Sequence, residues 1–319
     1  MTTFSPGADA PSPWPVFDGH VDLVYALQRQ SPFGLAAGVF NPRDLVAGGI
    51  RAIASVLYCA DTYNGSAAGH LAELIVVDDQ LLGNLPFIQN RSELDEVWRG
   101  VDSPGRLRLL ENADALLEFG VEAACAAGIV TVGLTHAGRN RLADGNAVAA
   151  PEGLTIAGRQ LLAALGKAER VIDVAHLAPP GFRQVLELYP GSLVCSHTGL
   201  RRFCDRPRNL DDDQLAALLG RGGMVGLAFA PELLAGSGAA DLEEVFWQLD
   251  WLVQRYGAEG VGLGSDFGGF DGVCRGLEDH TRLPALAARL QQAGYPPAAI
   301  AGIMGENWRR YYAAVLPRQ

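Results

Sequence analysis

Six polar residues stand at or just after the ends of short apolar segments, and their side chains are types that bind metals and move protons. Imidazole nitrogens and carboxylate oxygens ligate divalent cations, and the same groups serve as general acids and bases. A hydrophobic core does not require such polar side chains at the end of one apolar segment after another. The combination is typical of a hydrolytic site built on two metal ions. The six residues are His20, Glu111, His136, His176, His197 and Asp266.

The apolar segments before these residues alternate with helix-like segments along most of the chain. Strands are predicted at 15–20, 50–58, 106–111, 129–135, 170–176, 192–197, 223–229 and 260–266. Helices are predicted at 68–83, 113–127, 154–168, 179–188, 211–221, 241–256, 283–293 and 297–315. Eight strands alternating with helices predict an α/β fold, a (β/α)8 TIM-like barrel. The C-terminal ends of its strands meet at one face, which would bring the six side chains together.

The main alternative is an open, doubly wound sheet that binds a dinucleotide. Its glycine fingerprint would require a third glycine after Gly262 and Gly264, but Phe267 stands at that position. Local signals support the positions of the predicted helices. Asp211 and Gln214 form a capping-box pattern, and Pro179 suits the first turn of a helix.

Length and composition bound the class of protein. The chain has 319 residues, a net charge of −11 and 49% hydrophobic residues. One metallo-hydrolase barrel domain is expected over 1–319, with an extended N-terminal arm at 1–15 and a C-terminal helix and tail at 297–319. The negative charge argues against nucleic acid as a partner, and there is no apolar run of 18 residues for a membrane span. With no secretory signal pattern and five cysteines outside any CxxC pair, the expectation is a cytoplasmic protein.

Each candidate ligand also has a plainer interpretation. His20 and Asp22 are two apart, so in an extended segment both project to one side and can reach one cation. The plainer role for Asp22 is to cap a helix while His20 bonds a backbone carbonyl. His176 and His197 end neighbouring strands, but each alone could be a core histidine with a satisfied hydrogen bond. Glu111 can serve two cations, or it can complement the dipole of the helix at 113–127.

Asp266 can act as a metal ligand, as a general base toward metal-bound water, or as both; its plainer role is a turn residue beside Gly268 and Gly269. One two-metal site explains all these positions together, whereas the plainer roles must each hold separately. Nitrogen and oxygen donors favour zinc, with manganese, cobalt or iron as alternatives.

Two further residues are candidate substrate contacts. His136 can hydrogen-bond a developing oxyanion, and Arg208 can hold a carboxylate through two parallel bonds. A salt bridge within the loop is the alternative role for Arg208. The remaining cationic residues considered are expected on the surface: His70, Arg201, Arg202, Arg206 and His280.

The chain contains an ordered set of short motifs: Asp-Gly-His-x-Asp-Leu at 18–23, Leu-Thr-His at 134–136 with Asn140 four residues later, Asp-x-Ala-His at 173–176, Ser-His at 196–197, Arg-Asn-Leu-x-Asp at 208–212 and Gly-x-Gly-Ser-Asp-Phe at 262–267. This set resembles the renal (membrane) dipeptidase family of zinc peptidases, in the amidohydrolase superfamily. The resemblance covers about residues 16–310. The chain departs from the family at Glu111-Asn112-Ala113, where Glu-Gly-Gly is usual, and at Asp266-Phe267-Gly268-Gly269, where Asp-Phe-Asp-Gly is usual.

The resemblance implies a (β/α)8 barrel and a role for each matching residue. His20 and Asp22 would bind one metal, His176 and His197 the other, and Glu111 would bridge them. His136, Arg208 and Asn140 would contact the substrate, and Asp266 would be the acid/base partner of the bridging water. A homodimer is also implied.

The function expected is hydrolysis of dipeptides by a hydroxide that bridges two divalent metal ions, zinc foremost, with a dipeptide as the small-molecule partner and no nucleic acid or membrane involved. One alternative keeps the site but changes the substrate to an N-acyl amino acid, a lactone or another small amide or ester. Another is a non-catalytic barrel that binds a ligand.

Overall fold

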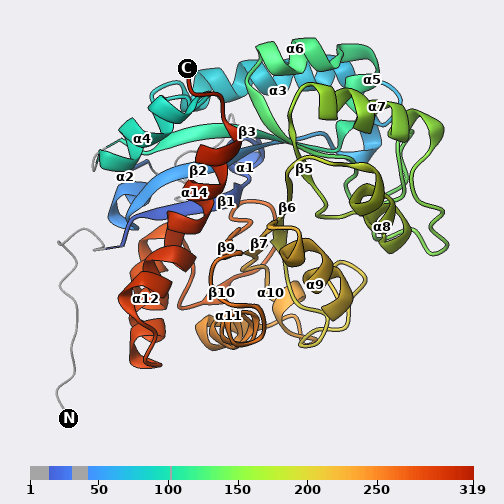
Figure 1. Cartoon of the computed structure of the whole chain (residues 1–319). Helices are drawn as coiled ribbons and strands as arrows, with labels where there is room; N and C mark the ends of the chain where they lie inside the picture. Colours follow the sequence, from blue (N-terminus) through green and yellow to red (C-terminus); the bar gives the residue numbers. More distant parts are fainter. Residues whose placement is uncertain (1–13, 31–41, 101–102) are drawn as a thin grey trace.

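Eight parallel strands form a closed barrel in the computed structural model, which describes residues 14–30, 42–100 and 103–319 (Figure 1). The predicted (β/α)8 architecture is confirmed, with every predicted strand present. The expected arm at 1–15 lies almost wholly outside the described residues. In barrel order the strands are β1 Val16–Val21, β2 Ile50–Tyr58, β3 Gly105–Glu111, β4 Ile129–Gly133, β5 Val171–Asp173, β6 Leu193–Thr198, β7 Met224–Leu227 and β9 Val261–Leu263.

The parallel pairing fixes which residues share the C-terminal end of the barrel. Strands β2 and β3 run in register from Ala52 opposite Gly105 to Tyr58 opposite Glu111. The barrel closes where β9 pairs with both β7 and β1. The strand residues are almost all buried, as expected for strands covered on both faces.

Helices surround the barrel, and most lie where the sequence predicts them (Figure 1). They are α3 Ala67–Leu82, α7 Ile156–Lys167, α8 Pro179–Leu188, α9 Asp212–Gly220, α11 Leu242–Tyr256 and α12 Leu283–Gln292. The predicted capping box of α9 is confirmed, because Asp211 accepts a hydrogen bond from the Gln214 amide and the Gln214 side chain bonds back. Pro179 opens α8 as predicted.

Two predicted helices are interrupted. The segment 113–127 divides into a 3-10 turn η3 Ala113–Ala115, α5 Leu116–Phe119 and α6 Val121–Ala126, because Gly120 has a φ of +87° that ends α5. The segment 297–315 divides into α13 Pro297–Ala301, a π-type turn Gly302–Glu306 and α14 Asn307–Val315. At that turn a Cβ on Gly305 would lie 2.4 Å from the Phe17 amide nitrogen, so the chain is pressed onto β1.

Several short elements were missed. They are α1 Leu23–Gln30, α2 Pro42–Ala47, α4 Arg91–Arg99, α10 Pro231–Leu234, the 3-10 turns η2 Asp61–Tyr63 and η4 His280–Arg282, and a two-stranded sheet of β8 Ala240–Asp241 with β10 Cys274–Arg275. Helix α4 carried a readable signal, since Asn90 and Glu93 form a capping box.

The C-terminal helix closes one end of the barrel. The Trp308 indole donates to the Leu263 carbonyl at 2.8 Å and lies so close to Gly19 and Gly262 that a Cβ at either glycine would approach it to 2.5 Å. Tyr312 stacks on Phe17 with ring centroids 5.3 Å apart. Figure 1 shows α14 crossing this part of the barrel. These aromatic side chains occupy the end of the barrel near Gly19 and Gly262, so a substrate site has room only at the opposite end.

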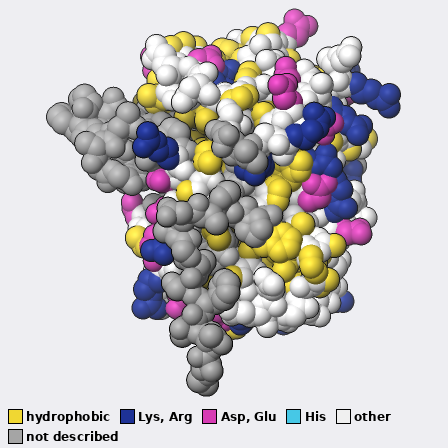
Figure 2. Space-filling model, turned by 90° about the vertical axis from the view of Figure 1, so that its left-hand side faces the viewer, with side chains coloured by type: hydrophobic (Ala, Val, Ile, Leu, Met, Phe, Trp, Pro, Cys, Tyr) yellow, Lys and Arg dark blue, Asp and Glu magenta, His cyan; other side chains and the backbone are white. Residues whose placement is uncertain are grey.

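Charged side chains of both signs lie on the face of the molecule shown in Figure 2. On the face shown in Figure 2, acidic and basic side chains of the described residues are interspersed around apolar ones rather than gathered by sign. Of the five cysteines, all are free thiols and four are buried. Arg202 and Arg206 are exposed and Arg201 is half-buried.

The two histidines expected on the surface are covered, so that prediction is wrong. His280 is 4% exposed and lies with Nε2 3.4 Å from Oδ2 of the fully buried Asp18. The His70 ring stacks on Tyr63 with centroids 3.9 Å apart, which leaves its side chain 14% exposed. The first contact joins η4 to β1 and the second joins α3 to η2, and the polar residues around each histidine in the sequence give no sign of burial.

Candidate metal centre and substrate cavity

The structure brings together all five predicted ligand residues at the C-terminal end of the barrel. His20 and Glu111 lie at the ends of β1 and β3, and His197 lies near the end of β6. Asp22 directly follows β1, and His176 lies three residues beyond β5. Because the strands are parallel, their ends meet although the residues are far apart in sequence.

Their donor atoms form two overlapping groups. His176 Nε2 lies 3.0 Å and His197 Nε2 3.8 Å from Glu111 Oε1, and the two Nε2 atoms are 3.1 Å apart. On the other side, His20 Nε2 lies 3.2 Å from Asp22 Oδ2. Within each group, Glu111 with His176 and His197 or Glu111 with His20 and Asp22, the donor atoms lie within 4.8 Å of one another. Glu111 therefore belongs to both groups.

The unpartnered atoms in this cluster fit a bound cation. Within the described part of the chain, the buried atoms Glu111 Oε1 and His20 Nε2 have no hydrogen-bond partner. His176 Nδ1 lies 3.2 Å from the Asn146 side-chain oxygen, so this ring donates from Nδ1 and keeps its Nε2 lone pair facing His197. Buried polar atoms without partners are costly, and a divalent cation satisfies such nitrogen and oxygen donors.

Electrostatics favour the metal-binding protonation states of Glu111, His176 and His197. Burial and the positive charge of Arg208 lower the pKa of His176 to about 3, and burial together with the neighbouring His20 lowers the pKa of His197 well below its usual value. Both rings are therefore neutral. Burial opposes ionisation of Glu111, but the imidazoles around it lower its pKa below the usual range. Burial alone would lower the pKa of His20, yet the bond and charge of Asp22 raise it to about 9, so a cation there competes with a proton.

The backbone is strained at the same place. Among the residues described, four other than glycine have φ in the left-handed region, namely Asn112, Glu169, His176 and Asp266. His176, at +62°, and Asp266, at +64°, belong to the cluster, and Asn112, at +70°, directly follows Glu111. Such conformations persist where the surrounding structure enforces them, commonly at functional sites.

Asp266 lies beside the cluster. Its Oδ1 is 3.9 Å from His20 Nε2, and its backbone amide donates to the His20 carbonyl at 3.0 Å. A Cβ on Gly269 would lie 2.3 Å from Asp266 Oδ1 and 2.6 Å from Asp22 Oδ2, so only glycine lets this loop pass so close to both carboxylates. Burial, and then the charge of Asp22, raise the pKa of Asp266 well above its usual value. A carboxylate with a raised pKa is suited to general base catalysis.

The cluster opens into a cavity of about 480 Å³ that is also lined by two of the three predicted substrate contacts, His136 and Arg208. Arg208 Nη2 donates to the His197 carbonyl at 2.9 Å, while its buried Nη1 has no hydrogen-bond partner among residues 14–30, 42–100 and 103–319. This guanidinium can therefore still bind an anion. The cavity is further lined by Tyr25, Tyr58, Asn146, Arg206 and Glu232.

His136 is held by an acidic partner on its far side. Its Nδ1 lies 3.1 Å from Asp61 Oδ2, which also accepts a hydrogen bond from the Gly138 amide at 2.9 Å. Burial opposes a charge on His136, but the bond to Asp61 prevails and raises its pKa. A protonated His136 has its Nε2–H free to donate while Nδ1–H is bound to Asp61.

The chain also matches a known protein family. The family model for membrane dipeptidase, peptidase family M19, matches residues 11–316.

The chain belongs to the membrane dipeptidase family.

Curated relatives of this family member include a dipeptidase of Aspergillus oryzae, 29% identical over 214 residues that cover 64% of this chain and 51% of the relative. The chain thus spans about half the length of that relative. A dipeptidase of Claviceps purpurea is 27% identical over 317 residues, which cover 91% of this chain and 74% of the relative. The solved structure of dipeptidase AC, a metallopeptidase of the same family, is 26% identical, with a TM-score of 0.84 over 95% of this chain and 99% of the other. Among the described helices, none combines the length and apolar character that crossing a bilayer requires.

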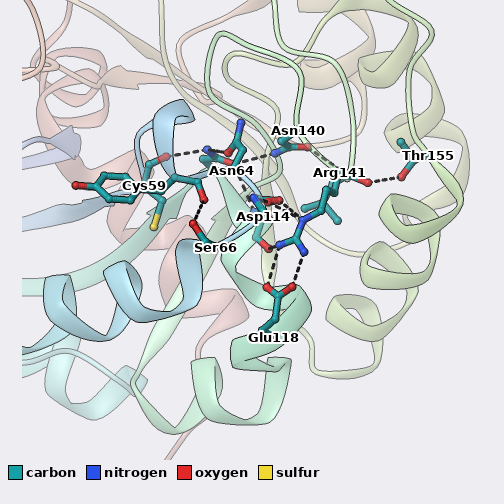
Figure 3. A network of polar contacts seen from close by, with 12 residues as sticks. Cys59, Asn64, Ser66, Asp114, Glu118, Asn140, Arg141 and Thr155 are labelled. Carbon is teal, nitrogen blue, oxygen red and sulfur yellow. Dashed lines mark hydrogen bonds and ion pairs between the residues drawn. The ribbon is translucent and has the colours of Figure 1, made fainter.

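One predicted substrate contact of this dipeptidase-family chain does not line the cavity. The Asn140 side chain donates to Asn112 Oδ1 at 2.8 Å and to the Leu134 carbonyl at 2.7 Å, and its oxygen accepts from the Leu142 and Ala143 amides. With its amide group fully used by Asn112 and by the backbone of its own segment, Asn140 supports the loop after β4 and does not line the cavity (Figure 3).

Asn112, at the position where the family usually has glycine, anchors the same network. Its side chain donates to the Cys59 carbonyl at 2.7 Å and to Asn64 Oδ1 at 2.8 Å, while accepting from Asn140. Figure 3 shows this network joining the segments after β2, β3 and β4, with Arg141 bound to Asp114 and Glu118. Asparagine tolerates the left-handed conformation found here and adds the cross-links. The loop beside Glu111 is therefore rigidly tied to its neighbours.

Sequence reasoning missed several residues at the site. Tyr58 ends a predicted strand, and Ser196 adjoins His197, so both had a local signal. Asp61, Asn146, Asp173, Arg206 and Glu232 were also missed; apart from Asp173, they lie outside the barrel strands. Their contribution depends on how the loops fold back over the cavity.

Proposed function

We propose that this member of the membrane dipeptidase family is a metal-dependent dipeptidase. Two divalent ions would be held by His20, Asp22, Glu111, His176 and His197. The observation that carries the proposal is that Glu111 Oε1 is buried, has no hydrogen-bond partner among the described residues, and belongs to two groups of metal donors. Arg208, whose Nη1 also has no hydrogen-bond partner among these residues, lines the same cavity. A metal-binding cluster and an anion-binding cation that line one cavity suit a small substrate with a free carboxylate.

When bound, the ions would supply a water of lowered pKa and polarise the scissile carbonyl. The protein side chains do the rest. Asp266 accepts the proton of the attacking water and passes it to the leaving amine. His136 donates from Nε2 to the oxygen on which negative charge develops, while Asp61 holds its Nδ1. Arg208 binds the terminal carboxylate and so restricts the enzyme to short peptides.

Three finer proposals have separate support. Zinc is proposed because the donors are imidazole nitrogens and carboxylate oxygens, which also suit manganese, cobalt and iron. A cytoplasmic location is supported by five free thiols. The homodimer rests on the family resemblance alone and is checked by the mass of the protein in solution.

Metal-loaded protein should hydrolyse dipeptides in preference to related amides and esters. The test measures kcat/KM on a panel of L,L and L,D dipeptides, N-acyl amino acids and lactones. We expect the best dipeptide to exceed the best lactone by ~10–100-fold, since a lactone lacks the carboxylate that Arg208 would bind and such a charged hydrogen bond contributes roughly 1.5–3 kcal/mol. N-acyl amino acids or lactones turned over faster than every dipeptide would assign the site to the alternative chemistry. Loss of turnover on chelation is the control.

Arg208→Ala should chiefly raise KM for dipeptides, by about 10-fold or more, because one charge-assisted bond to the carboxylate contributes about 1.5–3 kcal/mol. Arg202→Ala is the matched control, since Arg202 is exposed and bound to Asp212. A dipeptide amide, which lacks the carboxylate, should be bound equally by the wild type and the Arg208 variant. An unchanged KM for every peptide would show that Arg208 does not bind the substrate and has only a structural role.

A further inference from the structure

Ser196 lies between two of the candidate metal ligands, on the Nδ1 side of both rings. Its Oγ is 2.9 Å from His20 Nδ1 and 2.9 Å from His197 Nδ1. The two rings come from β1 and β6 and face each other with centroids 3.6 Å apart. On its remaining side, the Ser196 hydroxyl bonds to Oδ2 of Asp173, and all four side chains are buried.

The hydrogens of this group can be assigned by counting donors. A serine hydroxyl has one hydrogen to donate and two lone pairs that accept. Asp173 already accepts from the backbone amides of Ala175 and Ser196, each at 2.9 Å, so it acts as the acceptor for the hydroxyl too. The lone pairs of Ser196 are then left for His20 and His197, and each ring must carry its hydrogen on Nδ1. Their Nε2 atoms are directed at Asp22 and Glu111.

We propose that Ser196, oriented by Asp173, is a positioning residue that fixes His20 and His197 together in the tautomer that binds metal through Nε2. The inference rests on the metal site of the proposed function and adds a single hydroxyl that serves one ligand from each of the two donor groups. Partners of this kind commonly fix the ring orientation and basicity of a metal-binding histidine.

A metal ion on the Nδ1 side is the competing arrangement. Atoms of His20, Asp173 and His197 also lie within 4.8 Å of one another. However, Ser196 Oγ bonds to all three side chains and already satisfies them. Among the candidate metal ligands of the described residues, the buried atoms without a partner are His20 Nε2 and Glu111 Oε1, both on the Nε2 side. The Nδ1 side is therefore the supporting side of the site.

Barrel packing holds Ser196 in place. Its backbone carbonyl oxygen is so close to β7 and to the residue after β9 that a Cβ on Gly226 or Gly264 would approach it to 1.9 and 1.8 Å. The backbone of Ser196 is thereby confined by glycines on the neighbouring strands. Its side chain is fully buried, and the bonds to Asp173 and to both rings hold the hydroxyl in place.

Two variants separate this role from simple packing. Ser196→Ala removes the hydroxyl, and Asp173→Asn keeps the shape but places an NH2 where the hydroxyl needs an acceptor. In Asp173→Asn, Ser196 must accept from the amide and donate to a ring, which forces one histidine into the other tautomer. Zn²⁺ affinity, measured by competition with a chromophoric chelator, should fall about 10–100-fold in both variants. Ser55→Ala is the control, because Ser55 is equally buried but bonds to Asp78.

The tautomers themselves are measured by ¹⁵N NMR of the histidine rings in the wild-type protein, with and without Zn²⁺. We expect a hydrogen on Nδ1 of both His20 and His197 in either state. An Nδ1 without hydrogen on either ring would overturn the inference, as would wild-type Zn²⁺ affinity in both variants. Wild-type protein that binds no Zn²⁺ and cleaves no dipeptide would instead reject the proposed function, while the NMR result would still decide the role of Ser196.

Discussion

Asp266→Asn is expected to lower kcat on dipeptides by at least ~100-fold, the low end for loss of a general base. The amide has the shape of the carboxylate but accepts no proton from water. The backbone of Asp266 is held by the His20 carbonyl and its φ of +64° is one that asparagine tolerates, so the loop should keep its conformation. Kinetics and metal content are measured on the same preparation.

Metal content decides what such a loss means. Because Asp266 Oδ1 lies 3.9 Å from His20 Nε2 and Asp266 belongs to neither donor group with Glu111, we expect the variant to retain its metal. Loss of metal together with activity would make Asp266 a ligand, and full activity would remove it from the mechanism. Asp271→Asn, on an exposed residue of the same loop, is the matched control and should leave kcat unchanged.

Removal of the metal ions should lower dipeptidase activity by ~1,000-fold or more, because the pKa of water falls from about 15.7 to about 7 only when it is bound to a metal. Chelation should also lower the melting temperature. It leaves buried donors such as Glu111 Oε1 without a partner among the described residues, and it removes the stabilisation of about 2.7 kcal/mol that a ligand gives at 100 times its Kd. Calorimetry before and after dialysis measures this change, and restored metal should reverse both effects.

The sequence was sufficient for the barrel and for the convergence of the ligand residues. His20, Glu111 and His197 each lie at the end of an apolar segment. In a closed barrel of parallel strands, the C-terminal ends of all the strands lie at the same face, so these residues must come close together. The prediction needed only strand positions and order, which apolar periodicity and helix capping supply. The altered residue Asn112 also falls where the backbone is left-handed, so the substitution preserves the turn.

Loop contacts could not be predicted in the same way. Asn140 had a motif position but its amide group is used within the loop, and His280 meets Asp18, which is far away in the sequence. Gly120 divides a helix that apolar periodicity alone would continue. Helix α5 ends because of the local backbone conformation of Gly120, whereas for Asn140 and His280 the outcome is set by tertiary contacts between segments that have no common periodicity. The same applies to Arg206 and Glu232, which reach the cavity only because of how their loops fold.

The most direct test is to titrate metal-free protein with Zn²⁺ while measuring dipeptide hydrolysis. We expect no turnover at the start, a rise with added metal, and a plateau near two equivalents per chain, because Glu111 belongs to two donor groups. Full dipeptidase activity in protein shown to hold no metal would contradict the role of this cluster.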